Sequence, residues 1–364
     1  MKIKRFIITS LFLLFYISSI FPQSKQDKDA AVEIAMKAIK IMDEGKYNES
    51  IKLLEKSIKL DPERIDFPYE KAYAQYRKKD FKSAIKNLNN LTKHKDVNDR
   101  VFQLLGNCYD EMNNPDKAIK TYKKGLKKFP NSGKLFTELG ILEYNRGNYN
   151  LAIEYWEKGI DVEPIYASNY YWLGKVFSYS EERIWSILYS EMFINLERNS
   201  IRTVEISKLL YDTYKESIII SSDSVGKISF SKANIIGFSK NKLQIPFPIT
   251  FGLTMSVSLS TEMLNKKTEF SILLINNLRQ SFIKNWYEQK RNKKYPNVIF
   301  DFQKQLKEKS FFESYNYWLF MKGDEIEFNK WKLKNQSKFN EFIDWFSNNP
   351  IEINNKNYFS RNKY

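Results

Sequence analysis

The chain has 364 residues, of which 42% are hydrophobic and 16% aromatic, and this composition excludes a wholly disordered protein. Its 12 glycines and 10 prolines are few, which disfavours a turn-rich β protein. The formal net charge is +16, and most of it lies in residues 201–364, where 26 basic side chains outnumber 16 acidic ones. A charge of this sign suits a polyanionic partner.

The first 24 residues have the pattern of an export signal. Residues 2–5 contain three basic side chains, residues 6–21 form an apolar run of 16, and a polar stretch follows. The run is shorter than the roughly 20 residues of a membrane-spanning helix. We therefore expect a signal peptide over 1–24, cleaved between Pro22 and Ser24, with an uncleaved membrane anchor as the alternative. The mature chain is then expected in the periplasm, or outside the cell, where nucleic acid is not an expected partner. The basic excess there fits contact with an anionic envelope surface, or an ordinary solvated surface rich in lysine.

Small residues recur at a spacing of 34 along the next part of the chain. A fixed period of this size indicates stacked copies of one supersecondary unit, and small residues let two helix backbones approach closely where they cross. Two such series occupy structural positions of the repeat: Ala38, Ala72, Gly106, Gly140 and Gly174, and Ser50, Ala84, Ala118, Ala152 and Ser186. A series of larger residues at the same spacing fills the space beside them: Leu54, Leu88, Tyr122 and Trp156.

Each unit has the pattern of two amphipathic helices joined by a short turn. In the fourth unit, apolar residues recur every three or four positions over 136–144 and again over 152–160, on either side of Gly147. Pro164 ends that unit, because proline does not continue a helix. The spacing therefore predicts a helix–turn–helix in every unit.

The repeats resemble the tetratricopeptide repeat family over residues 30–198. Tyr170-Tyr171-Trp172-Leu173-Gly174 is similar to the family's aromatic-x-x-Leu-Gly element, and Leu-Gly recurs at 105–106 and 139–140. The resemblance implies an all-α fold, a right-handed α-solenoid of about five helix-turn-helix repeats over 30–200. The fifth unit diverges, with Ser190 at a large position and Phe193 at a small one. Such a unit is expected to cap the stack or to dock onto the next domain.

The second half of the chain is expected to form a mostly helical C-terminal domain. A capping helix is predicted over 201–220, with Thr203 as its N-cap, followed by a linker over 221–248 that contains short strands. Helical periodicity returns over 249–350, and the asparagine-rich residues 351–364 are predicted to form a loose tail.

Candidate residues for catalysis or metal binding are few. The chain has one histidine, His94, and one cysteine, Cys108, so a zinc site, a nucleophile–histidine pair and a disulfide are all disfavoured. Cys108 is expected to be a buried small residue rather than a reactive thiol. No catalytic residue, metal or cofactor is predicted, although the many carboxylates leave a two-carboxylate hydrolase open.

The resemblance also implies a binding groove along the first helix of each unit. Tyrosine offers a rigid apolar surface with a polar tip, so three tyrosines on one helical stripe favour a peptide or protein partner. Tyrosine is common throughout this chain, however, and this favours the alternative that the three residues have no binding role. The register carries the groove positions onto Tyr69, Tyr73, Tyr76, Gln103, Asn107, Asp110, Thr137, Ile141, Tyr144, Tyr171 and Lys175.

We therefore expect an exported scaffold that binds a protein or peptide in the bacterial cell envelope. In the alternative hypothesis the C-terminal domain is an enzyme or a binder of anionic envelope polymers, with the repeats as a docking module. The motivation for it is the basic run at 290–294 and a set of four tryptophans, Trp286, Trp318, Trp331 and Trp345. A purely structural subunit of a larger assembly is a third hypothesis.

Overall fold

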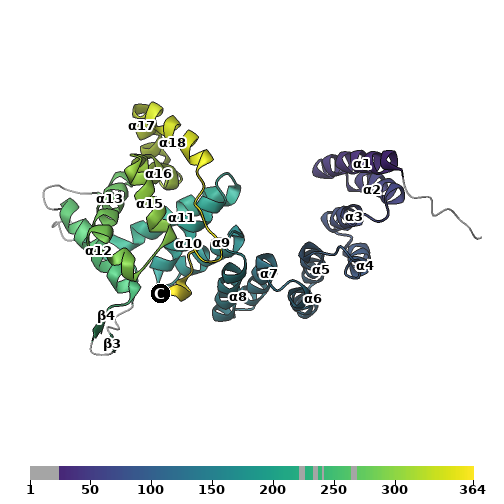
Figure 1. Ribbon diagram of the computed structural model, residues 1–364, viewed down its shortest axis with the longest axis horizontal. Helices are drawn as coiled ribbons and strands as arrows, with labels where there is room; N and C mark the ends of the chain where they lie inside the picture. Colours follow the sequence, from purple (N-terminus) through teal and green to yellow (C-terminus); the bar gives the residue numbers. More distant parts are fainter. Residues whose placement is uncertain (1–23, 221–225, 233–236, 240–241, 264–268) are drawn as a thin grey trace, which may run out of the picture. The chain divides into compact units, whose positions relative to one another are not determined.

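The computed structural model describes residues 24–220, 226–232, 237–239, 242–263 and 269–364. The expected signal peptide, apart from Ser24, and parts of the expected linker lie outside the described residues. Within these ranges the chain has eighteen α-helices, which pair consecutively, and four strands of three residues each (Figure 1). The predicted all-α fold class is confirmed. The chain divides into two compact units, one ending at Thr121 and the other beginning at Tyr122.

The first unit is a stack of helical hairpins. Its small core is formed largely by alanines on the inner face of the first helix, together with Leu54 and Phe67. Its helices are α1 (Lys25–Asp43), α2 (Tyr47–Leu60), α3 (Asp66–Arg77), α4 (Phe81–Leu91) and α5 (Asp99–Glu111), followed by the beginning of α6 (Pro115–Lys128).

The turns between paired helices repeat with the period of the sequence. Gly45, Lys79, Asn113 and Gly147 each have a positive φ, between 55° and 81°, and they stand 34 residues apart. Glycine adopts this left-handed conformation without steric cost, and other residues adopt it rarely. Glu181, at the matching position of the fifth unit, has no such φ. The regular turn therefore ends with the fourth unit.

The second unit contains the remaining repeats and a helical domain around them. Its elements are the rest of α6, then α7 (Gly133–Asn145), α8 (Tyr149–Val162), α9 (Ala167–Ser178), α10 (Arg183–Leu196), α11 (Ile201–Ser217), β1 (Ile218–Ile220), β2 (Gly226–Ile228), β3 (Gly237–Ser239), β4 (Lys242–Gln244), α12 (Phe247–Met263), α13 (Ile272–Glu288), α14 (Arg291–Lys294), α15 (Val298–Glu308), α16 (Phe312–Leu319), α17 (Glu325–Lys334) and α18 (Gln336–Asn348). Strand β1 pairs with β2 and β3 with β4, both antiparallel, as two short hairpins.

The ten small repeat positions are all buried, and the glycines show why they are small. A Cβ atom on Gly140 would lie 2.2 Å from the indole nitrogen of Trp156. In the fifth unit Ser190 replaces the large residue, and a Cβ on Gly174 would lie 2.5 Å from its hydroxyl and 3.3 Å from its main-chain nitrogen. The divergence at Ser190 therefore brings the backbones of α9 and α10 together.

Helix α10 is the centre of the second unit rather than an outer layer. Every residue from Ile184 to Asn195 is buried, because α9 and α11 pack on it from the repeats and α15 packs on it from the C-terminal helices. This is the docking of the fifth repeat onto the next domain that its divergent sequence predicts.

Helix α11 continues the repeat stack by half a unit. Arg202 donates to Ser168 and Tyr171 donates to Glu205, and each pair is 34 residues apart. The helix runs over Ile201–Ser217, with Ser200 as the N-cap and Thr203 at the third position of a capping box. The prediction of Thr203 as the cap is therefore wrong.

The prediction of a loose tail is also wrong. The segment after α18 runs back past α9 and α10 (Figure 1), and Ile351 and Phe359 are buried. Arg361 forms an ion pair with Glu157 of α8, and the ring of Tyr364 stacks on Phe247 with their centroids 4.3 Å apart. The aromatic and aliphatic side chains between the asparagines account for this packing, because each fills a site made by residues distant in sequence.

Candidate functional site

Three predicted groove residues form a continuous aromatic stripe on α3 in the first unit. Tyr69, Tyr73 and Tyr76 are each partly exposed, and the rings of Tyr73 and Tyr76 stack with centroids 6.4 Å apart. The stripe lies beside α5, because the Arg100 guanidinium sits 4.5 Å from the Tyr69 ring centroid and the Tyr76 hydroxyl reaches Glu111 at 3.5 Å. The three rings thus form one half-exposed surface.

Charged groups border the stripe. The Arg77 guanidinium lies over the rings of Tyr73 and Tyr47, at 5.8 and 5.7 Å, and donates to both hydroxyls at 3.4 and 3.5 Å. These hydrogen bonds raise the pKa of Arg77, so it remains charged. Burial raises the pKa of Tyr69, which therefore stays a neutral phenol. The surface thus combines flat apolar area, phenol hydroxyls and a fixed guanidinium.

The predicted groove residues of α5 line the neighbouring helix. Gln103, Asn107 and Asp110 are partly exposed and recur at spacings of four and three, so they share one face of α5. Helices α3 and α5 pack directly on one another. Six of the eleven predicted groove positions therefore lie on two adjacent helices of the first unit.

The predicted positions of the second unit are largely occupied by the chain itself. Thr137 is 3% exposed, and its hydroxyl bonds to the Gly133 carbonyl at 3.0 Å and to Asn169 at 2.7 Å. The ring centroids of Tyr144 and Trp156 are 6.0 Å apart. Tyr144 and Ile141 are both partly buried.

Helix α11 takes up the remaining two positions. Tyr171 is 7% exposed and donates to Glu205 at 2.6 Å, and Lys175 forms an ion pair with the same carboxylate, also at 2.6 Å. The resemblance to the repeat family does not predict that Tyr171 and Lys175 are covered. It implies that the helix after the fifth unit is a cap, whereas in the structure this helix continues the stack and contacts both residues.

A second group of charged residues is completely buried in the second unit. Arg279 holds Glu191 through two hydrogen bonds, at 2.7 and 2.9 Å, and Gln303 and Tyr315 donate to the same carboxylate at 2.7 and 2.8 Å. Asn316 and the Tyr214 hydroxyl accept further guanidinium bonds, at 2.7 and 3.1 Å. The cavity beside this cluster is only about 10 Å³, room for no more than about one water molecule. The cluster is therefore structural and has no room for a substrate.

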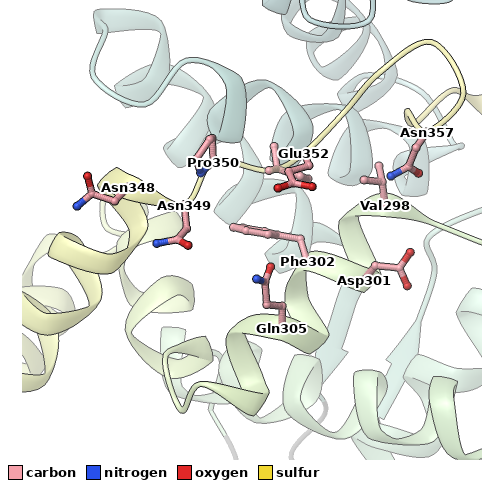
Figure 2. A pocket seen from close by; sticks show the side chains of 10 residues that line it. Val298, Asp301, Phe302, Gln305, Asn348, Asn349, Pro350, Glu352 and Asn357 are labelled. Carbon is pink, nitrogen blue, oxygen red and sulfur yellow. The ribbon is translucent and has the colours of Figure 1, made fainter.

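The second unit also has a surface cavity of about 430 Å³ between α15 and the segment that follows α18 (Figure 2). Two carboxylates border it, as the enzyme hypothesis requires, but Asp301 points away from the Phe302 ring whereas Glu352 turns towards it. One oxygen of Asp301 already accepts a hydrogen bond from the Tyr287 hydroxyl. The two carboxylates therefore do not converge on one reacting position. The lining residues are Val298, Asp301, Phe302, Gln305, Asn348, Asn349, Pro350, Ile351, Glu352 and Asn357.

Comparison with known families identifies the repeats. Residues 33–150 match the family described as Psidin, N-terminal TPR repeats region. This part of the chain is a tetratricopeptide repeat (TPR) region. No curated protein matches the chain.

Solved structures similar to the chain include several proteins with helical repeats. PilF of Pseudomonas aeruginosa is 16% identical, with 53% of this chain and 86% of that chain covered and a TM-score of 0.43. PilW, titled a widely conserved type IV pilus biogenesis factor, is 15% identical, with coverage of 51% and 85% and a TM-score of 0.41. YrrB, titled a TPR protein with an unusual peptide-binding site, is 16% identical, with coverage of 50% and 94% and a TM-score of 0.32.

The one histidine and the one cysteine, His94 and Cys108, lie in surroundings that do not favour catalysis. In the TPR region, His94 accepts a hydrogen bond from the main-chain nitrogen of Asp96, and Cys108 is fully buried. Burial raises the pKa of the Cys108 thiol to about 12, so the reactive thiolate does not form at neutral pH. Among the described residues, no group of three or more histidine, cysteine, aspartate or glutamate side chains is placed to hold a metal ion.

Part of the basic run and most of the tryptophan surface of the C-terminal helices are used within the chain. Arg291 and Lys294, from the basic run, donate to main-chain carbonyls of residues 250 and 245. Trp286, Trp318 and Trp331 are at most 9% exposed, and Trp345 is partly buried. These tryptophans pack the core instead of forming an exposed platform for a polymer. Among the helices that the structure describes, none has the length and apolar character needed to cross a bilayer.

Proposed function

We propose that the chain is a scaffold whose TPR region binds an extended peptide or protein segment through the stripe of Tyr69, Tyr73 and Tyr76. The carrying observation is the half-exposed aromatic surface on α3, bordered by Arg77 and the polar face of α5. Partly exposed tyrosines next to an arginine have the composition of interface hot spots. The aromatic rings would cover apolar side chains of the partner, and Arg77 would meet its carbonyls or carboxylates.

Substituting the stripe should weaken partner capture in a pull-down of mature full-length protein against envelope extract. We expect the Tyr69→Ala, Tyr73→Ala, Tyr76→Ala triple variant to bind at least about tenfold less of its partner, because hot-spot tyrosines contribute more than about 1 kcal/mol each. Tyr179→Ala is the matched control, since Tyr179 is 80% exposed and lies off the stripe. Equal capture by a folded triple variant would rule out this surface.

We propose further that the scaffold acts outside the cytoplasm, in the cell envelope. Support comes from the basic residues at 2–5 and the 16-residue apolar run at 6–21. The mature N-terminus, determined on protein purified from its own cells, is expected to begin between residues 23 and 25. A full-length protein that still begins at Met1 in the cytoplasmic fraction would contradict export.

A further inference from the structure

The cavity between α15 and the segment after α18 is lined by two carboxylates and four side-chain amides, those of Gln305, Asn348, Asn349 and Asn357 (Figure 2). The side-chain amides of Asn348 and Asn349 donate to main-chain carbonyls of the preceding turn, at 2.9 and 2.7 Å. Each amide keeps its oxygen as an acceptor and one further N–H as a donor. Asp301 and Glu352 add carboxylate oxygens to the same lining. A ligand that carries several N–H donors therefore matches this surface.

The lining is negative although the chain carries a net charge of +16. It contains two carboxylates and no lysine, arginine or histidine. Glu352 is exposed and forms none of the ion pairs found among the described residues, whereas Asp301 uses one oxygen for Tyr287. Arg198 approaches from the other side, but its guanidinium is bonded to main-chain carbonyls at the end of α18. Glu352 therefore has no ion-pair partner among the described residues.

The floor of the cavity is apolar and flat. Val298 and Ile351 are buried, and the Phe302 ring, 5% exposed, is stacked on Trp345 with centroids 6.4 Å apart. The volume of about 430 Å³ lies within the range of small-ligand sites and holds one long side chain or a small molecule. Apolar floor and polar rim together suit a cation on a methylene stem.

We propose that this cavity binds an organic cation, a guanidinium or ammonium group. Two sources supply that chemistry: an arginine or lysine side chain of an extended peptide, and a free polyamine. Glu352 provides the charge contact, and the asparagine oxygens accept the remaining N–H groups. The same two carboxylates repel an anionic polymer from this cavity.

Calorimetric titration of the mature full-length protein tests the ligand class. The probes are the peptide acetyl-Gly-Arg-Gly-amide, its neutral analogue with citrulline in place of arginine, and spermidine. We expect saturable binding of the arginine peptide, of spermidine, or of both, and which of them binds identifies the source. Citrulline has nearly the same shape without the charge, so it should not bind. Equal affinity for citrulline, or no saturation by either cation, would overturn the proposal.

The variant Glu352→Gln tests the site. We expect it to weaken cation binding at least about tenfold, because it replaces a charge-assisted hydrogen bond by a neutral one. Glu341→Gln is the matched control, because Glu341 is exposed on α18 and accepts from Ser337 outside the cavity lining. Both variants remove a surface charge, so their thermal unfolding should match that of the parent. Unchanged affinity in Glu352→Gln would place cation binding elsewhere.

Discussion

The variant Arg279→Met should lower the free energy of unfolding of the second unit by about 3–5 kcal/mol. Arg279 and Glu191 are 3% and 1% exposed, and their bidentate ion pair joins α13 to α10. Burial by itself lowers the pKa of Arg279, but the bonded Glu191 carboxylate outweighs this effect and raises it. Removing the guanidinium leaves a carboxylate without its counter-charge in the core. Urea denaturation followed by far-UV circular dichroism measures the loss.

A double variant separates the pair from the cavity that its removal creates. In Glu191→Leu with Arg279→Met both charges are replaced by apolar side chains, so we expect a smaller loss than in Arg279→Met alone. Lys208→Ala is the control for a surface pair, because Lys208 and Asp212 are 61% and 42% exposed and their contact should contribute no more than about 0.5 kcal/mol. If Arg279→Met proved as mild as Lys208→Ala, the buried pair would not hold the two parts of the unit together.

The sequence contained a sign of this buried pair that periodicity analysis passes over. Glu191 is the only charged residue of α10 between Ile184 and Asn195, in a helix that is otherwise apolar or small on all sides. A helix without a polar face is buried, and a charge inside it requires a partner. Arg279 likewise lies on a buried face of α13, with Ile275 one turn before it and Phe282 and Ile283 one turn after it. The two lie 88 positions apart, so the pattern shows that each needs a partner and does not show which one.

Local regularity explains what could be predicted. The spacing of 34 locates the helices, the left-handed turns and the buried small residues, because each unit repeats the same contacts with its neighbours. The packing of residues 351–364 has no such period. Phe359 and Tyr364 fill sites formed by Trp185 and Phe247, and only the tertiary structure brings these together. The asparagine-rich composition of residues 351–364 therefore led to the wrong prediction of a loose tail.

The predicted groove positions are partly exposed on α3 but covered at Tyr171 and Lys175, because tertiary contacts that the repeat does not specify decide which positions are covered. On α3 the tyrosine stripe stays partly exposed, as the register implies, and it remains a prediction for binding. At Tyr171 and Lys175 the register is equally regular, but α11 supplies Glu205 to both. A repeat position faces a partner only when no further helix of the same chain covers it.

The variant Gly140→Ala should destabilise the second unit by about 3 kcal/mol, at the upper end of the usual cost of overpacking. The added Cβ would lie 2.2 Å from the Trp156 indole nitrogen. Trp156 is fully buried, and its ring stacks on that of Trp172 with centroids 5.7 Å apart. Its indole N–H also donates to the Thr137 carbonyl, so the side chain has little freedom to move. Urea denaturation of the full chain measures the change.

The same substitution in an open position should act in the opposite direction. Gly252 lies within α12, and a Cβ atom there would meet nothing within 4 Å. Gly252→Ala is therefore expected to stabilise the protein by about 0.5–1 kcal/mol through helix propensity alone. Destabilisation by both variants would show that the loss at Gly140 does not come from Trp156.

A double-mutant cycle tests whether the repeat specifies small and large residues as pairs. The first two units combine alanine with leucine, Ala38 with Leu54 and Ala72 with Leu88, at the positions that Gly140 and Trp156 hold in the fourth. Trp156→Leu alone should cost about 3 kcal/mol by leaving a cavity. Combined with Gly140→Ala it recreates the pair of the first units, so the double variant should lose at least about 1 kcal/mol less than the sum of the single variants. Additivity within about 0.5 kcal/mol would mean that the residues at these two positions vary independently, and that the period of 34 sets helix spacing without setting which side chains meet.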